Sequence, residues 1–359
     1  MKKWLLVLAL VVLCVTPAWG EALPRELLDA VPEEARMLLD GELEETENYQ
    51  ALDEGISGLW KRGCKLLLTT LRESVGGIAA VLIVMLLCAV ATDCFHASGS
   101  KGGTVVLAGT LVVLLAVMGS MDSMMGLGKR TLEELNVFSQ ALLPTLSAAT
   151  AASGGLISAS VRQVLTLLFS GSLLGLIEGV LLPLVWIYVA AAAAGAILPA
   201  GNLGGIAEAV RKLIIWMLSG GLLLFTGYLS LSGAFAGSAD RLALQVTRTT
   251  IGSVIPVVGG IISDAADSVL ASAGVLRQSV GIFGTLVILA SCLLPFVKLG
   301  VQYLLLRLCA FLSAAVAPGE LVKLVEALSG AFGLVLAMTG TGALLLLISV
   351  ASTVSAVSL

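Results

Sequence analysis

Charged residues are scarce in this sequence, and their scarcity excludes most classes of soluble protein. Of 359 residues only 12% are charged, whereas 58% are apolar and the mean hydropathy is +1.05. A soluble domain carries about a quarter charged residues, so a globule of this composition could not keep its apolar surface from water. A secreted enzyme, a nucleic-acid-binding protein and a disordered scaffold are therefore excluded. The composition predicts a polytopic membrane protein.

Histidine and paired cysteines are also lacking. His96 is the only histidine, which excludes a histidine-based catalytic triad, an HExxH site and a His-rich metal site. The six cysteines include no CxxC pair and indicate neither a disulfide framework nor a zinc site. The Walker A, GxGxxG and GxSxG motifs do not occur. We therefore expect no catalytic residues, no cofactor, no bound metal and no enzymatic activity.

The amino-terminal region carries a targeting pattern and then an excess of acid. Residues 1–20 begin with two lysines, continue as an apolar run and end in small residues, the pattern of a secretory signal peptide. An uncleaved anchor is the alternative. Half of the 24 acidic residues lie between Glu21 and Glu54. We expect residues 21–73 to form an exported acidic segment with short helices, and residues 74–359 to form a polytopic transmembrane domain.

Long apolar runs predict an all-α integral membrane protein with about six to eight transmembrane helices. The predicted spans are 75–92, 104–120, 164–198, 213–231, 280–297, 299–316 and 331–350. Residues 164–198 would form a helix of about 52 Å, against a hydrocarbon core of about 30 Å. Because Pro183 lies near their middle, one kinked helix and a helical hairpin both fit. With an exported amino terminus the loop charges contradict the positive-inside rule, so charge does not define the orientation.

Two further apolar segments, 138–160 and 251–273, are interrupted by proline and glycine. The interrupting residues are Pro144, Gly154 and Gly155 in the first and Pro256, Gly259 and Gly260 in the second. Paired interruptions are typical of the broken helices that line transport sites. They predict two amphipathic or re-entrant segments related by duplication. The alternative is that the small residues only let helices pack closely.

Few charged side chains interrupt the apolar runs. Glu178 and Arg307 each lie within one, where a charge costs about 2.5–3.5 kcal/mol. We expect the two to form an ion pair, and the alternative is that each snorkels or faces a wet cavity. Close to Glu178, overlapping GxxxG repeats predict close packing of helices, and their glycines are Gly171, Gly175 and Gly179.

Asp264 and Asp267 lie three residues apart and so share one face of a helix. Two carboxylates in this arrangement can bind a cation or act as an acid–base pair. The alternative is the solvated face of an interfacial helix. An intramembrane aspartyl enzyme would use the same pair, but the spacing and the interfacial position argue against it.

Residues 238–281 resemble the most recognisable stretch of the stage III sporulation protein AE family. Their sequence is SADRLALQVTRTTIGSVIPVVGGIISDAADSVLASAGVLRQSVG. Asp240 and the basic residue after it lead into a PvvGg…sDa core and a basic or polar ending. The earlier segment LLPTLSAATAASGGLISAS is similar to the proline-to-GlyGly stretch of that family. The resemblance covers nearly the whole chain, although its amino-terminal region is short for the family.

The resemblance implies a role in endospore formation. It implies a multi-pass protein of the mother-cell membrane around the forespore, as a scaffold or pore-lining subunit of a channel complex that supports late forespore gene expression. Membrane lipid, the other channel subunits and, indirectly, a forespore membrane partner would be its contacts. Homo-oligomers are compatible with it, and nucleic acid is not a partner. From the residues alone, the alternative is a stand-alone secondary transporter that uses broken helices and Glu178.

Overall fold

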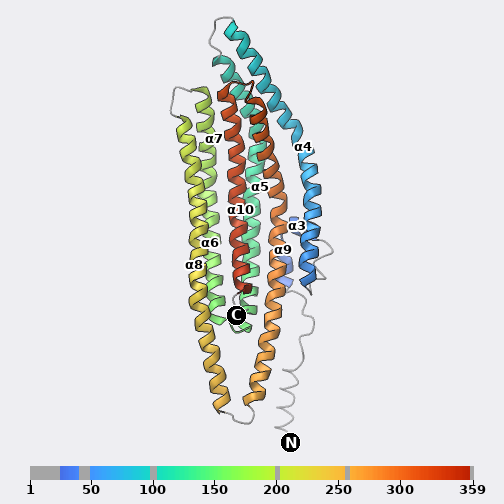
Figure 1. The fold of residues 1–359 in the computed structure, drawn as a ribbon, viewed down its shortest axis with the longest axis vertical. Helices are drawn as coiled ribbons and strands as arrows, with labels where there is room; N and C mark the ends of the chain where they lie inside the picture. Colours follow the sequence, from blue (N-terminus) through green and yellow to red (C-terminus); the bar gives the residue numbers. More distant parts are fainter. Residues whose placement is uncertain (1–24, 40–48, 98–102, 199–202, 255–258, 356–359) are drawn as a thin grey trace.

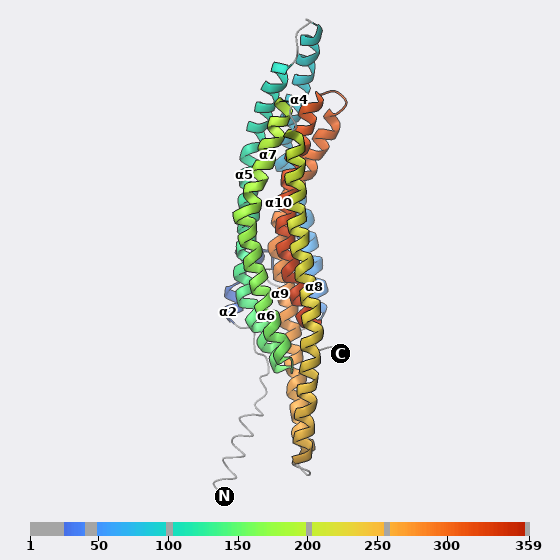
Figure 2. The same cartoon turned by 90° about the vertical axis from the view of Figure 1, so that its left-hand side faces the viewer.

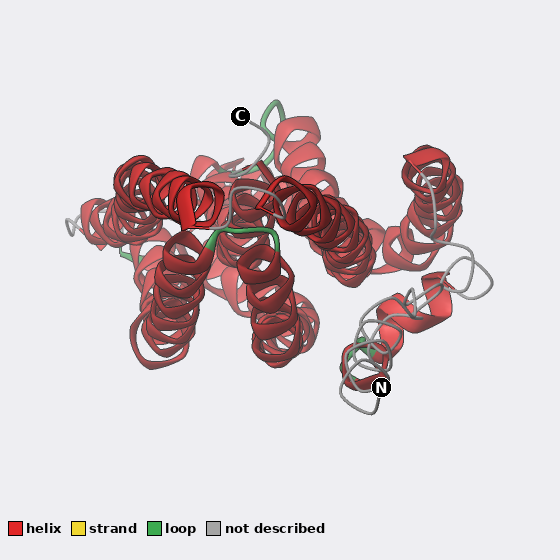
Figure 3. Ribbon diagram, turned by 90° about the horizontal axis from the view of Figure 1, so that it is seen from below, coloured by secondary structure: helices red, strands yellow, loops and turns green. Residues whose placement is uncertain are grey.

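The computed structural model describes residues 25–39, 49–97, 103–198, 203–254 and 259–355 as helices joined by short turns (Figure 3). The predicted signal peptide lies outside these residues. The helices are α2 (Arg25–Asp29), α3 (Glu33–Leu39), α4 (Tyr49–Ala97), α5 (Gly103–Ala152), α6 (Leu156–Leu176), the π-helical turn η1 (Ile177–Leu181), α7 (Leu182–Ile197), α8 (Leu203–Val254), α9 (Gly259–Ser313) and α10 (Gly319–Ser355). The predicted all-α class is confirmed for the described residues.

Six of these helical stretches are long and apolar enough to cross a membrane. They are Ser57–Cys94, Thr104–Ala152, Ala159–Ile197, Gly204–Ser232, Ser268–Ser313 and Gly319–Val354. A helix satisfies its own backbone hydrogen bonds, which is the condition for lying in hydrocarbon. The described part of the chain therefore has six candidate membrane spans, at the lower end of the predicted range.

The helices are much longer than a bilayer is thick. The longest, α9, has 55 residues and extends about 82 Å at 1.5 Å per residue. Figures 1 and 2 show the α4–α5 pair extending above the other helices and the α8–α9 pair extending below them. Each helix pair is thus displaced along the bundle axis relative to the next.

Two apolar clusters hold the bundle together. One contains Met85, Ile214 and Phe332 and joins α4, α5, α7, α8, α9 and α10. The other contains Phe138 and Phe283 and joins α2, α3, α4, α5, α8, α9 and α10. Because lipid tails are as apolar as these side chains, the bundle is held by close packing rather than by removal from water. α10 contributes to both clusters and lies centrally among the helices (Figure 1).

The predicted division between spans 280–297 and 299–316 is wrong. Both belong to the single helix α9, which contains Pro295 and continues through Lys298. One lysine does not end a helix, because its long side chain can reach a polar neighbourhood while its backbone stays hydrogen bonded. The prediction from apolar content therefore put a boundary between two spans at Lys298, where the helix is continuous.

Residues 164–198 form one continuous helical path and no hairpin. The π-helical turn η1 lies directly before Pro183, and the backbone N–H of Leu182 donates to Ile177 O, five residues earlier. Proline lacks an N–H, and its ring would collide with the carbonyl four residues before it in a regular helix. The wider π turn relieves that collision, so the chain passes the proline without reversing.

The first of the two predicted re-entrant segments, 138–160, is the end of one helix, a turn and the start of the next. Pro144 lies inside the uninterrupted helix α5. At the end of α5, the N–H of Gly155 donates to Thr150 O and the N–H of Gly154 to Ala151 O, both at 3.0 Å. Gly154 has a φ of 97°, which completes a Schellman motif that only glycine enters easily. In the second segment α8 ends at Val254 and α9 begins at Gly259, while Pro256 lies outside the described residues.

Close packing predicts a difference between two glycines on neighbouring helices. A Cβ on Gly284 would lie 2.7 Å from Leu142 Cδ2, whereas a Cβ on Gly220 would meet no atom within 4 Å. Alanine gains up to about 1 kcal/mol of helix propensity at either site, but overpacking at Gly284 costs about 1–3 kcal/mol. We expect Gly284→Ala to melt at a lower temperature in detergent than Gly220→Ala. Equal melting temperatures would contradict the packing described here.

Candidate functional site

A cavity lined by charged side chains lies near one end of the bundle, between α7, α8, α9 and α10. Its volume is about 380 Å³. Its charged lining consists of Glu208, Arg211, Arg307, Glu320, Lys323 and Glu326. These are three acidic and three basic groups, so the lining is close to neutral but strongly polar. A volume of this size is in the range of small-ligand sites.

Small residues provide the space for this cavity. Ala192, Gly195 and Ala196 line it on α7, and Gly204 and Ala207 face them from α8. Tyr188 adds a hydroxyl group to the wall and is only 4% exposed. A Cβ on Gly330 would lie 2.7 Å from that hydroxyl oxygen, so the glycine makes room for the tyrosine. The chain thus positions one buried hydroxyl beside six charged side chains.

Ion pairs organise the charged lining. Arg307 Nη1 lies 3.8 Å from Glu326 Oε1 on α10, and Arg211 Nη1 lies 3.7 Å from Glu208 Oε2 one turn away on α8. These side chains are 46–54% exposed, so each pair keeps contact with the cavity and contributes little to stability. The arrangement can accept a polar solute or hold water.

The predicted pair between Glu178 and Arg307 is wrong. Glu178 Oε1 lies 3.8 Å from Lys129 Nζ on α5, and the same nitrogen lies 3.7 Å from Glu133 Oε1. Arg307 pairs instead with Glu326. Glu178 of η1 pairs across to α5 and Arg307 of α9 pairs across to α10, so each charge finds its partner on a helix that packs beside it.

The glycine repeat on α6 and η1 packs against no other helix of the described chain. Gly171, Gly175 and Gly179 are exposed, and a Cβ on any of them would meet no atom within 4 Å. The predicted close helix packing at these glycines is therefore absent within the described part of this chain.

The structure describes the side chain of only one of the three predicted aspartates. Gly259 and Gly260 form the start of α9, followed by Asp264 and Asp267, whose side chains lie outside the described residues. Asp240, by contrast, is buried near Arg162 of α6. Among the described residues no cluster of histidine, cysteine, aspartate and glutamate could hold a metal ion.

Sequence reasoning missed most of the charged lining. Charged residues are spaced three apart directly before two apolar runs. They are Glu320, Lys323 and Glu326 before one run and Glu208 and Arg211 before the other. That spacing places each set on one helix face, which is a signal for a shared polar site. Taken singly, however, such residues resemble the ordinary solvated ends of membrane spans.

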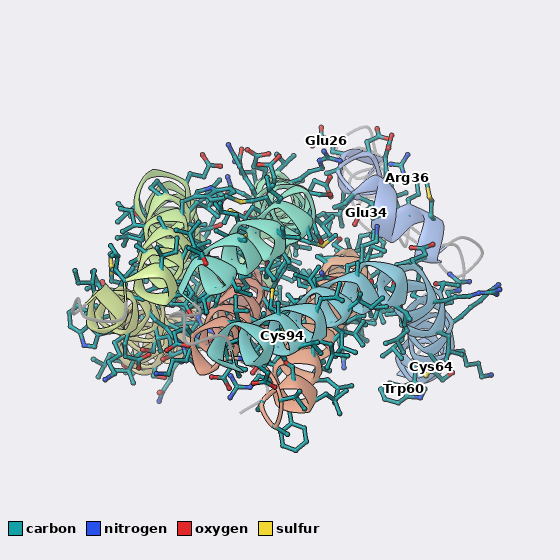
Figure 4. The ribbon with its side chains drawn as sticks, turned by 90° about the horizontal axis from the view of Figure 1, so that it is seen from above. Glu26, Glu34, Arg36, Trp60, Cys64 and Cys94 are labelled. Carbon is teal, nitrogen blue, oxygen red and sulfur yellow. The ribbon has the colours of Figure 1, made fainter. Side chains whose placement is uncertain are left out.

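The short helices α2 and α3 bind the side of the bundle through an apolar face. Leu27, Val31 and Ala35 are at most 5% exposed and join the cluster that contains Phe138. Figure 4 shows Glu34 on the side of α3 that faces the other helices. Burial raises the pKa of Glu34, and the positive charges of Lys298 and Arg130 offset that effect only in part.

This burial predicts that α3 binds more tightly when Glu34 is neutral. A carboxyl group whose pKa is raised in the bound state favours that state as the pH falls through the raised pKa, and the preference is lost above it. We expect Glu34→Gln to slow hydrogen exchange of residues 25–39 at neutral pH. The exchange rate of the variant divided by that of the wild type should approach one as the pH falls. Glu33→Gln is the control. Faster exchange in Glu34→Gln would show that ion pairs dominate instead.

The cavity makes a second prediction that labelling can test. In a chain whose six cysteines are replaced by alanine, we expect Ala192→Cys to react with a membrane-impermeant cationic thiol reagent, because Ala192 lines the cavity. Ala193→Cys, at a position 8% exposed in the apolar cluster, is the matched control and should stay unlabelled. Absence of labelling at Ala192→Cys would mean that the cavity is closed to water, and strong labelling of both positions would contradict the burial of Ala193.

The fold and the cavity define a polytopic α-helical membrane protein with a polar cavity at one end of its bundle. Residues 43–357 match the family model described as Stage III sporulation protein AE. The match covers most of the chain, which therefore belongs to the stage III sporulation protein AE family. This membership confirms the resemblance found in the sequence.

A curated relative supports the same family. The chain is 24% identical over 219 residues to Stage III sporulation protein AE of Bacillus subtilis (strain 168), which is 61% of this chain and 55% of the relative. The chain thus matches about half the length of that relative. No solved structure matches the chain.

Proposed function

We propose that this chain is a membrane subunit of a channel complex between the mother cell and the forespore, in which it serves as a scaffold or lines the path. Membership of a sporulation family supports the role in sporulation. In this proposal the protein resides in the mother-cell membrane around the forespore, with its amino-terminal segment exported. It acts with other channel subunits and has no catalytic role.

The exposed apolar surface is the observation that favours a subunit over a stand-alone carrier. On α8 the side chains of Leu242 and Val246 are 63% and 65% exposed and lie beyond the candidate span Gly204–Ser232. Val246 is about 21 Å further along the helix than Ser232. Exposed apolar side chains outside hydrocarbon are suited to contact with another protein, so they favour a protein partner at this part of α8.

The charged cavity supports a path-lining role. Its ion pairs are half-exposed and lie among helices that are otherwise apolar, so it offers polar solutes a place within the bundle. A carrier coupled to protons or ions would use more ionisable groups inside its spans than the few found here. The cavity is thus better suited to a shared path than to coupled transport by one chain.

A deletion in the native host tests the proposal. We expect normal vegetative growth, loss of heat-resistant spores after engulfment and loss of a late forespore reporter. Gly195→Trp, which fills the cavity, should fail to restore spores, whereas Gly220→Trp adds the same volume where a Cβ meets nothing within 4 Å and should restore them. Normal sporulation in the deletion strain, or robust solute uptake by the purified chain alone in liposomes, would overturn the proposal.

A further inference from the structure

Three buried charges meet at the lower end of the bundle, far from the cavity. Arg162 of α6 is 6% exposed, and Asp240 of α8 and Arg277 of α9 are each 7% exposed. The last turns of α10 join them, since Arg162 Nη1 donates to the carbonyl oxygen of Ser352 and, at 2.9 Å, to its hydroxyl oxygen. Four helices, α6, α8, α9 and α10, therefore converge on one charged cluster.

Hydrogen bonding in this cluster is incomplete. Nε of Arg162 and both Nε and Nη1 of Arg277 are buried and have no hydrogen-bond partner among the described residues. A buried donor without an acceptor costs about 1–3 kcal/mol, and more when it is charged. Three such nitrogen atoms on two neighbouring guanidinium groups indicate a missing acceptor.

The charge balance of the cluster is positive. Arginine remains protonated in proteins. Among the described side chains, Arg162 has one positive group, Arg277, and one negative group, Asp240, within electrostatic range. The carboxyl end of α10 adds about half a negative charge. Among the described groups of this cluster an excess of positive charge remains in surroundings of low polarity, and an anion would neutralise it.

Room for a ligand lies beside Arg277. Gly274 precedes it by one turn on the same face of α9, and a Cβ there would meet no atom within 4 Å. Along α9, Arg277 and Lys298 are 21 residues apart, or about 32 Å. This separation matches the hydrocarbon thickness of about 30 Å, which places Arg277 at the depth of lipid headgroups when Lys298 lies at the opposite surface.

We propose that Arg162 and Arg277 form a binding site for a phosphate-class anion. Guanidinium groups bind phosphate through paired N–H donors, and the phosphate oxygens would accept hydrogen bonds from the three nitrogen atoms that have no partner among the described residues. The bound anion would tie α6 and α9 to the end of α10. A phospholipid headgroup and free phosphate share this chemistry.

The melting temperature of the full chain in a neutral detergent, freed of lipid, tests the site. We expect phosphatidylglycerol to raise the melting temperature of the wild type by roughly 5 °C, and phosphatidylcholine to raise it much less. Arg277→Gln should lose this rise, while the control Arg72→Gln, at an exposed position on α4, should keep it. If inorganic phosphate alone reproduces the rise, the free anion is the ligand; if only phosphatidylglycerol does so, the headgroup is.

The stability of Arg277→Gln without any anion provides a second readout. Since Nε and Nη1 of Arg277 have no partner among the described residues, its removal should leave the lipid-free protein at least as stable as the wild type. Should Arg277→Gln fail to fold, Gly274→Leu tests the same site, because the leucine side chain would fill the open space beside Arg277. This variant should also lose the rise in melting temperature with phosphatidylglycerol. An equal rise with both lipids, no rise with any anion, or an unchanged rise in the folded variant would overturn the proposal.

Discussion

Backbone hydrogen bonding in apolar surroundings is the constraint on which the rest of this structure depends. A chain with 58% apolar residues can lie in hydrocarbon only where each N–H and C=O is paired within its own segment, which requires helices. The prolines show that helical hydrogen bonding continues even at residues that lack an N–H group. Pro144 and Pro295 remain inside continuous helices, and a π-helical turn precedes Pro183. The helices therefore run past positions that would end them in a soluble protein.

Long helices in turn decide where the charged side chains meet. Antiparallel neighbours bring together residues at equal heights, so Lys129 of α5 meets Glu178 of η1, and Arg307 of α9 meets Glu326 of α10. Each pair joins consecutive helical segments around one turn. The cavity then forms where two such helix pairs, α7–α8 and α9–α10, face each other with alanine and glycine between them.

The class of fold and most of the spans could be predicted because they depend on local composition. The helix ends could not, since Lys298 continues a helix whereas Gly154 ends one through its backbone conformation. The same limit applied to the site. Glu178 and Arg307 were found as charges in apolar runs, but their partners depend on which helices are neighbours. Asp240 was found through the family motif, whereas Arg162 resembled an ordinary charge at the end of a span until the fold buried it.

The two ends of the bundle make different physical demands on the same chain. At the upper end, charges are balanced, half-exposed and arranged around open space, which keeps a polar region accessible at little cost. At the lower end, charges are buried, unbalanced and short of acceptors, which is costly unless something completes them. α9 and α10 contribute residues to both regions. The same two helices therefore carry side chains into an open polar cavity and into a buried charged cluster.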